Sequence, residues 1–284
     1  MILLRKIYYN KKSSKKYGWH PSWLDIQLTK FDEELIDYIK NFQLMHDLVA
    51  DGLIGPTTFR RLLANRDLQR SENYILINGN HIAIDWDIKH DIMPNSCYKT
   101  WPRLRKPNMI VTHWDATTSA EKCKRVLQAR GISTHFCIDN DGIIYQYVDT
   151  NNAAWHAGGV NNKSIGIDFS NAYYMKYNSY YKRKGFNKRP ICKDSRVHGV
   201  KLRQHLGYYP VQIEAYKKLI KVLCDHYDIP YETPMKYASV PDTGVVREAK
   251  YGKYKGIVCH YHVSRNKIDC AGLKLHEIVK ELKE

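Results

Sequence analysis

Three residues near the ends of expected strands carry side chains that can bind a catalytic zinc ion. His113 follows the apolar run 109–112, His260 follows the run 256–259, and Asp269 comes nine residues after His260. A catalytic zinc ion takes three protein ligands from His, Cys, Asp or Glu and keeps a fourth position for water. Each residue alone is weak evidence, because the chain has 13 histidines and most histidines are solvent-exposed or structural.

The elements that must position these residues alternate between strands and helices. Apolar runs bounded by turn residues predict strands and hairpins, and apolar residues at helical spacing predict helices. We expect strands at 109–112 and 164–169, a hairpin at 135–148 that turns at 139–142, a capped helix at 118–131, and a long helix from Pro210 to Tyr227. The predicted fold class is α/β, with a mixed central β-sheet flanked by helices.

A compact helical unit is expected before this sheet. Apolar residues recur at near-helical spacing from Phe31 to Leu44, and a second short helix is indicated from Thr57 to Leu63. The turn between them, 51–56, contains two glycines and a proline suited to the first turn of a helix. We therefore divide the chain into a helical domain (1–70), a linker with a β-hairpin at 74–88 (71–106), and a main domain (107–284).

The composition limits the partners and the compartment. A formal net charge of +16 implies attraction to polyanions, which include nucleic acid, an anionic membrane face and envelope polymers. The seven cysteines are odd in number and have no paired spacing, so we expect reduced thiols. We see neither the apolar stretch of a signal peptide nor a run of about 18 apolar residues. We expect a chain that stays in the cytoplasm where it is made, without a transmembrane segment.

Residues 173–208 form an unusual segment within the main domain. They contain ten Lys or Arg residues, one acidic residue and six tyrosines, with little periodicity. We interpret this basic insertion as a solvated surface loop, with a functional lid or arm as an equal alternative.

Four sequence blocks, taken in order, closely resemble the type-2 N-acetylmuramoyl-L-alanine amidases. They are Ile-Val-Thr-His at 110–113, Ser-Thr-His-Phe-Cys-Ile-Asp-Asn-Asp-Gly-Ile-Ile-Tyr-Gln at 133–146, Ala-Trp-His-Ala-Gly at 154–158 with Asn-Lys-Ser-Ile-Gly-Ile-Asp at 162–168, and His-Tyr-His-Val-Ser-Arg-Asn-Lys-Ile-Asp at 260–269. The resemblance covers residues 107–284. It implies hydrolysis of the amide that joins N-acetylmuramic acid to L-alanine in bacterial peptidoglycan.

The resemblance also implies roles for single residues. His113, His260 and Asp269 would bind one zinc ion per chain, which can acidify water and polarise a carbonyl. Cys270 is a competing third ligand, because some relatives use a cysteine near this place, but Asp269 keeps the family's Lys-x-Asp spacing. Lys267 would stabilise the developing oxyanion. Asp168, where some relatives carry Glu, would act as the general base.

Four further residues are expected to lie along the substrate groove: Thr134, His135, Trp155 and His156. Thr134 departs from relatives that carry a catalytic Tyr at this position, and Thr cannot replace a phenol in proton transfer. This departure puts more weight on Asp168. Trp155 is equally suited to core packing and to contact with a sugar.

The first domain resembles the three-helix peptidoglycan-binding domain, through Phe42-Gln43 and the run Asp51-Gly52-Leu53-Ile54-Gly55-Pro56-Thr57. It would hold the enzyme on the wall rather than take part in chemistry. Together these resemblances imply a monomeric phage endolysin that binds peptidoglycan, and anionic envelope polymers with it. It would wait in the host cytoplasm until another protein releases it to lyse the cell.

Two alternatives come from other functional classes. The chain would be a non-catalytic peptidoglycan-recognition module if a zinc ligand were lost, but all three are present. It would be a nucleic-acid or polymerase-binding regulator if the basic insertion bound nucleic acid. Charge is the only support for this second alternative, since no recognised nucleic-acid motif accompanies it.

Overall fold

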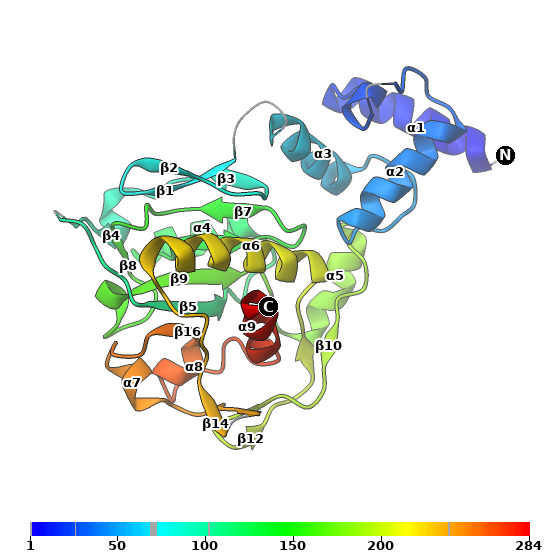
Figure 1. Cartoon of the computed structure of the whole chain (residues 1–284). Coiled ribbons are helices and arrows are strands. Elements are labelled where there is room, and N and C mark those ends of the chain that lie inside the picture. The colour runs from blue at the N-terminus through cyan, green and yellow to red at the C-terminus, as the bar shows by residue number, and fades with distance from the viewer. Residues whose placement is uncertain (1, 26, 69–72, 102, 238) are drawn as a thin grey trace.

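A mixed six-stranded sheet lies at the centre of the molecule (Figure 1). The computed structural model describes residues 2–25, 27–68, 73–101, 103–237 and 239–284, with the side chains of 65–68 left aside. The strands of the sheet, in spatial order, are β16 (Gly256–Cys259), β5 (Met109–Trp114), β9 (Ser164–Phe169), β6 (Phe136–Ile138), β7 (Ile144–Gln146) and β3 (Ile88–His90). Only the β6–β7 pair is antiparallel. The predicted α/β fold class is confirmed.

Helices cover both faces of this sheet, which explains why its central strands are apolar throughout. Alternate residues of β6 belong to different cores: Phe136 and Ile138 pack with α6 (Pro210–Tyr227) and α9 (Leu275–Lys283), whereas Cys137 packs with α4 (Ala120–Ala129). Side chains of a strand point alternately to opposite faces. The sheet is therefore a layer between α6 and α9 on one side and α4 on the other.

Three helices form a separate unit at the N-terminus, which we call the helical unit (residues 2–68). It consists of α1 (Ile2–Tyr17), α2 (Glu33–Met45) and α3 (Pro56–Leu68) around a core that includes Trp19 and Ile39. The small helical domain predicted from the sequence is present, and its expected end near residue 70 lies outside the described residues. Helix α1 was not expected, because it buries the polar residues Asn10 and Ser13 rather than an apolar stripe.

The turn between α2 and α3 explains the position of α1. Asn10 donates through Nδ2 to the Gly52 carbonyl at 2.9 Å and accepts from the Ile54 amide at 2.9 Å. Gly52 has a φ of +73°, and a Cβ there would lie 2.7 Å from Ile36. The turn needs glycine for both reasons.

The expected linker contributes directly to the main unit (residues 73–284). Strands β1 (Tyr74–Ile77) and β2 (Asn80–Ala83) form the predicted hairpin around Asn78 and Gly79, which both have positive φ, as a two-residue type I′ turn requires. Strand β3 then joins the edge of the central sheet beside β7. This segment is therefore part of the packed fold.

The helical unit contacts the main unit through ion pairs to buried carboxylates and through a side-chain hydrogen bond to a backbone amide. Arg60 on α3 binds Asp139 at 2.7 Å and Asp141 at 2.6 Å, and both carboxylates are fully buried. Its neighbour Arg61 pairs with Asp87. Asp47 accepts from the Val211 amide at the start of α6 at 2.8 Å. These contacts fix how the two units sit together.

The basic insertion is more ordered than a solvated loop. It contains α5 (Asn178–Arg183), the pair β10 (Ile191–Cys192) and β13 (His205–Leu206), and the hairpin β11 (Arg196–Val197) and β12 (Val200–Lys201). Arg189 is 1% exposed. It donates to Asn140 Oδ1 at 2.5 Å, to Gln212 Oε1 at 2.7 Å and to two backbone carbonyls, between two tyrosine rings. A buried guanidinium with four hydrogen bonds therefore anchors a segment whose lysines are exposed to solvent.

The remaining short elements join these parts. They are β4 (Tyr98–Lys99), β8 (Ala153–Ala154), β14 (Met235–Tyr237), β15 (Val240–Pro241), α7 (Arg247–Lys250), α8 (His260–Val263), and the 3-10 turns η1 (Pro21–Trp23), η2 (Asn95–Cys97), η3 (Asn161–Lys163) and η4 (Met175–Tyr177). Within the described ranges, no helix is both long and apolar enough to cross a membrane.

Candidate metal centre and active site

His113, His260 and Asp269 meet at one edge of the sheet. Strands β5 and β16 are adjacent and parallel, so His113 on β5 and His260 directly after β16 lie at the same edge. The Nδ1 atoms of the two histidines are 3.0 Å apart, and Asp269 Oδ2 lies 3.1 Å from His113 Nδ1 and 3.0 Å from His260 Nδ1. Three potential ligand atoms thus surround one point, and all three side chains are buried.

This spacing fits a small metal ion. Zinc bonds to nitrogen and oxygen of about 2.0–2.2 Å at tetrahedral angles put ligand atoms roughly 3.3 Å apart. The donor set of two imidazoles and one carboxylate leaves one position open. Cys270 lies elsewhere, since its Sγ contacts Cys259 Sγ and the Thr112 carbonyl oxygen, both at 3.4 Å. The structure therefore brings Asp269, rather than Cys270, to the two histidines.

His156 holds the far side of the His113 ring. His113 Nε2 lies 3.0 Å from His156 Nδ1, and His156 Nε2 lies 3.2 Å from Ser164 Oγ, which donates to the Val160 carbonyl. If His113 offers the Nδ1 lone pair to a metal, its Nε2 carries the proton. Each group in this chain can then donate to the next, and His113 is oriented as outer hydrogen bonds commonly orient metal-binding histidines.

Gly166 makes room for this arrangement. A Cβ at Gly166 would lie 2.6–2.9 Å from ring atoms of His156. The sequence marks this position, because glycine inside a buried strand often indicates close approach of another group. Gly166 and Ser164 both fall within the block 162–168, but the residue types alone do not show that they support His156.

Burial and hydrogen bonding set the charge of His113 and Asp269. It lowers the pKa of His113 to about 4, so the ring is neutral and has a lone pair for a metal. Burial by itself would raise the pKa of Asp269, but hydrogen bonds from His113 and His260 hold that pKa below its usual value. A carboxylate at Asp269 beside a neutral imidazole at His113 suits a metal site, because metal ligands must be deprotonated.

Asp168 and Lys267 lie next to this group. Asp168 is the residue of β9 paired with His113 on β5, and it is buried. Burial and the nearby Asp115 carboxyl raise the pKa of Asp168 well above its usual value, while Thr134 and Lys267 oppose the shift. Lys267 is exposed, and its charge also lowers the pKa of His113. A buried carboxyl and an accessible cation therefore face the candidate ligands.

The four expected groove residues have different surroundings. Trp155 is 38% exposed and His156 is partly exposed, so both can meet a substrate. Thr134 is buried beside Asp168. His135 differs from the expectation, because its ring is fully buried, accepts from the Gly166 amide at 2.9 Å and lies 3.0 Å from the Asn152 carbonyl oxygen. Backbone groups contact both ring nitrogens of His135, so its ring holds the fold together and does not line the substrate groove.

A second group of metal-binding residue types consists of Asp115, Cys123 and Cys137, and its Asp115 is near Asp168. The Asp115 carboxylate accepts from Thr117 and from the Asn171 amide. Burial raises the pKa of Cys137 to about 12, so that thiol keeps its proton. These surroundings favour a hydrogen-bonded, partly buried acid rather than a metal site.

Residues 103–272 match the model of the N-acetylmuramoyl-L-alanine amidase family. The match covers 170 of the 284 residues and includes all three candidate ligands. The chain belongs to this family. The predicted family and enzyme class, an amidase that hydrolyses an amide bond of peptidoglycan, are confirmed.

Several solved structures match this chain at low sequence identity. The amidase LysC from Clostridium intestinale URNW is 20% identical, with a TM-score of 0.40, and the match covers 69% of this chain and 97% of LysC. A mutant endolysin from Bacillus subtilis is 20% identical, with a TM-score of 0.40, covering 69% and 99%. The amidase AmiD from E. coli is 18% identical, with a TM-score of 0.41, covering 65% and 60%. No curated protein matches the sequence.

Proposed function

We propose that this amidase is zinc-dependent and cuts the bond between the lactyl group of N-acetylmuramic acid and L-alanine of the peptide stem. The convergence of His113, His260 and Asp269 carries the proposal, because their nitrogen and oxygen atoms lie 3.0–3.1 Å apart. A zinc ion bound there would supply Lewis acidity to a carbonyl and lower the pKa of water.

The residues beside the candidate ligands suit the remaining steps of amide hydrolysis. Asp168 is buried within reach of the same edge of the sheet, and we assign it the transfer of a proton from the attacking water to the leaving amine. Lys267 is assigned to the developing negative charge on the carbonyl oxygen, where a fixed cation stabilises the transition state more than the ground state. His156 and Ser164 orient His113.

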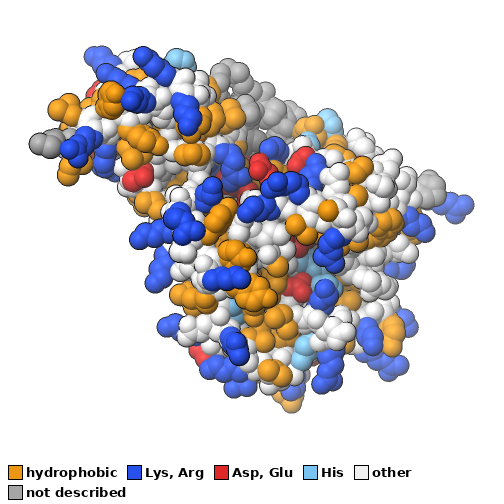
Figure 2. Space-filling model, turned by 180° about the vertical axis from the view of Figure 1, so that it is seen from behind, with side chains coloured by type: hydrophobic (Ala, Val, Ile, Leu, Met, Phe, Trp, Pro, Cys, Tyr) orange, Lys and Arg blue, Asp and Glu red, His pale blue; other side chains and the backbone are white. Residues whose placement is uncertain are grey.

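We further propose that the protein acts as a phage endolysin, which stays in the host cytoplasm until it is released to the wall. The helical unit would bind peptidoglycan, as its resemblance to wall-binding domains implies. Lys and Arg side chains are spread over both units on the face in Figure 2, with few acidic ones among them. This surface would attract anionic envelope polymers, an effect that salt weakens.

Product analysis tests the reaction. Purified sacculi are digested with the full chain, and the new ends are identified by mass spectrometry and end-group labelling. We expect new L-alanine amino termini without new reducing sugars. New reducing ends would instead assign the chain to sugar cleavage and refute the amidase mechanism.

Metal analysis tests the zinc assignment. We expect one zinc per chain by elemental analysis, and reversible loss of sacculus digestion on chelation. His113→Ala and His260→Ala should each lose the metal and the activity, whereas His226→Ala, at an exposed histidine on α6, should keep both. Full digestion by metal-free protein would refute the assignment.

A further inference from the structure

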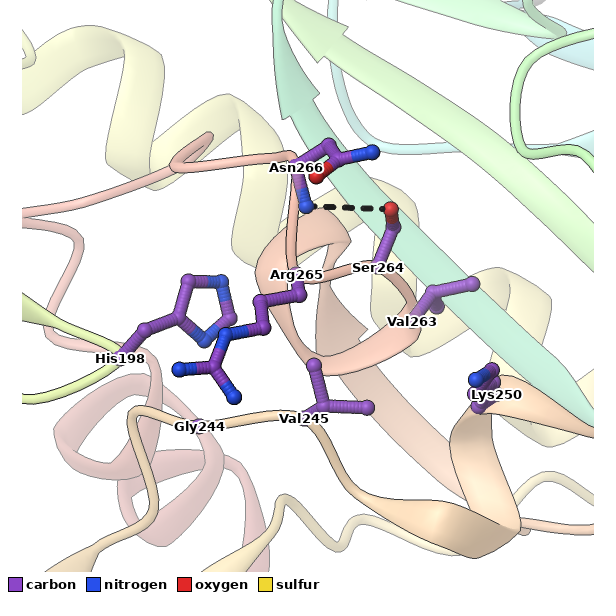
Figure 3. Close-up of a pocket in the computed structure, with 8 residues that line it drawn as sticks. All are labelled: His198, Gly244, Val245, Lys250, Val263, Ser264, Arg265 and Asn266. Carbon is purple, nitrogen blue, oxygen red and sulfur yellow. Dashed lines mark hydrogen bonds between the residues drawn. The ribbon is translucent and has the colours of Figure 1, made fainter.

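A basic pocket lies beside the loop that joins the candidate ligands His260 and Asp269. Its volume is about 640 Å³, within the range of small-molecule sites. Figure 3 shows its lining: His198, Gly244, Val245, Lys250, Val263, Ser264, Arg265 and Asn266. None of these eight residues is acidic.

Three separate segments build this pocket. The hairpin of β11 and β12 turns at His198 and Gly199, which both have positive φ. The turn binds the other two segments, since the His198 amide donates to the Thr243 carbonyl at 2.8 Å and the His198 ring lies 3.0 Å from the Lys267 carbonyl oxygen. Asp242 is near, but its carboxylate accepts from the Gly244 amide. The basic insertion thus supplies one wall of the pocket.

The side chains combine two cations with an apolar floor. In Figure 3 the Arg265 guanidinium lies between the His198 ring and the backbone at Gly244, while Lys250 stands on the other side of Val245 and Val263. Arg265 and Lys250 are both exposed, and within the described part of the chain neither belongs to an ion pair. Such a lining suits an anion attached to an aliphatic chain.

We propose that this pocket binds a carboxylate of the peptide stem, namely the free α-carboxylate of a γ-linked glutamate in the second position. The proposal rests on the amidase function, because it places the stem relative to the bond that is cut. Arg265 is the principal partner, since a guanidinium can bind a carboxylate through two parallel hydrogen bonds. Lys250 adds a second positive charge.

The chain length between the pocket and the candidate ligands agrees with this placement. Asn266 and Asp269 are three residues apart, a separation of at most about 11 Å in extended chain. The second stem residue lies two residues from the scissile amide, or roughly 7 Å in extended form. These two lengths allow a stem whose scissile bond lies at the candidate metal centre to reach the edge of the pocket that Asn266 forms, and Lys267 follows Asn266 directly on the same loop.

A binding measurement tests the pocket without using activity. The probes are two synthetic peptides, Ala-γ-D-Glu-Lys with its C-terminus amidated and the same peptide with the glutamate α-carboxylate also amidated. We expect the full chain to bind the acidic peptide about tenfold more tightly, a typical contribution of one charge-assisted hydrogen bond. Arg265→Ser should abolish this preference, and Lys250→Ser should reduce it. Arg247→Ser, which removes a positive charge from the same helix as Lys250 but outside the pocket, should keep it.

Kinetics with the matching pair of soluble muropeptides gives an independent measurement. Arg265→Ser should raise KM for the acidic substrate to that of the amidated one and leave kcat nearly unchanged. Equal binding of both peptides by the unmodified protein, an unchanged preference in Arg265→Ser, or an equal loss in Arg247→Ser would overturn the pocket. Cleavage of both substrates without a preference would support the amidase function and refute the binding role of the pocket. An Arg265-dependent preference without cleavage would support the pocket and refute the amidase function.

Discussion

The contact between Arg60 and the 139–142 turn yields a prediction that can be worked out from the structure. Arg60 comes from the helical unit and is about one-third exposed, with a side-chain exposure of 30%, whereas Asp139 and Asp141 are 0% exposed. Tyr145 adds a third partner through its hydroxyl at 3.2 Å. Arg60→Ala removes the cation and leaves two neighbouring carboxylates buried in one turn.

The expected cost comes from those stranded charges. Removing one partner of a buried ion pair destabilises a protein by about 3–5 kcal/mol, because the remaining charge is desolvated without compensation. Some of this cost will be relieved as water enters where the Arg60 side chain stood. We therefore expect Arg60→Ala to lower the free energy of unfolding by about 3 kcal/mol, a large part of the roughly 5–15 kcal/mol that a folded protein has.

Equilibrium unfolding in urea, followed by tryptophan fluorescence, measures this change. Lys40→Ala is the matched control, because Lys40 on α2 pairs with Asp37 at 2.7 Å but both side chains are exposed. An exposed pair contributes about 0–1 kcal/mol. The two substitutions therefore remove the same kind of charge from the same unit with different expected costs.

A compensating substitution separates charge from shape. Adding Asp139→Asn and Asp141→Asn to Arg60→Ala removes the stranded charges, and we expect at least half of the lost stability to return. If Arg60→Ala costs no more than Lys40→Ala, or if the two amides restore nothing, then desolvated charge is not what joins the two units.

Three further substitutions or truncations test other parts of the structure. Arg189→Leu should lower the free energy of unfolding in urea by about 3 kcal/mol or more, because it leaves buried acceptors unpaired. Lys188→Ser, at the adjacent exposed position, should change that free energy by no more than about 0.5 kcal/mol. Equal effects of the two substitutions would refute the anchoring role of Arg189. Gly166→Ala should weaken zinc binding about 10–100-fold in a chelator competition, because the added Cβ displaces His156. Gly158→Ala should leave zinc binding unchanged, because a Cβ there would meet nothing within 4 Å. Equal zinc affinities of the two variants would contradict the role of Gly166 in positioning His156. The fragment 73–284 should melt about 10 °C below the full chain in calorimetry, as expected for a loss of roughly 3 kcal/mol, and an unchanged melting temperature would show that the helical unit stabilises nothing.

Much of the sheet was predictable because its signals are local. The strand expected at 164–169 and the helix expected at 210–227 have those bounds in the structure, and the strand expected at 109–112 extends to Trp114. Buried parallel strands are continuous apolar runs, and a long amphipathic helix has one apolar stripe. In such elements the apolar residues that form the sequence pattern are the same residues that are buried in the fold.

The candidate site was predictable only in part. His113, His260 and Asp269 were chosen through family resemblance, and the fold brings their ligand atoms together across up to 156 positions of sequence. His135 stands in the same matched block as its neighbours, yet its ring points into the backbone of β9. Whether a histidine on a strand faces the substrate or the interior depends on its neighbours in space, and a single sequence does not show those neighbours.

The basic insertion shows why charge and composition were misleading. Its lysines are exposed, as their number suggests, but Arg189 is as basic as they are and lies in the core. An arginine can be buried where its donors find acceptors, and Arg189 makes four hydrogen bonds. Those acceptors include Asn140 and Gln212, which lie 49 and 23 positions away, so no local pattern marks Arg189 as different from Lys188.

The 139–142 turn connects these observations. As a sequence it is an Asp-Asn-Asp-Gly hairpin turn, and the structure confirms that turn between β6 and β7. Its side chains also receive Arg60 from the helical unit and Arg189 from the insertion. Because the same sheet also carries Asp168 and His113, the two arginines attach both additions to the layer that positions the site. The helical unit and the insertion are therefore part of one folded body with the amidase sheet. For this reason substitutions at Arg60 and Arg189 should lower the stability of the protein, although neither residue lies near the candidate metal ligands in sequence.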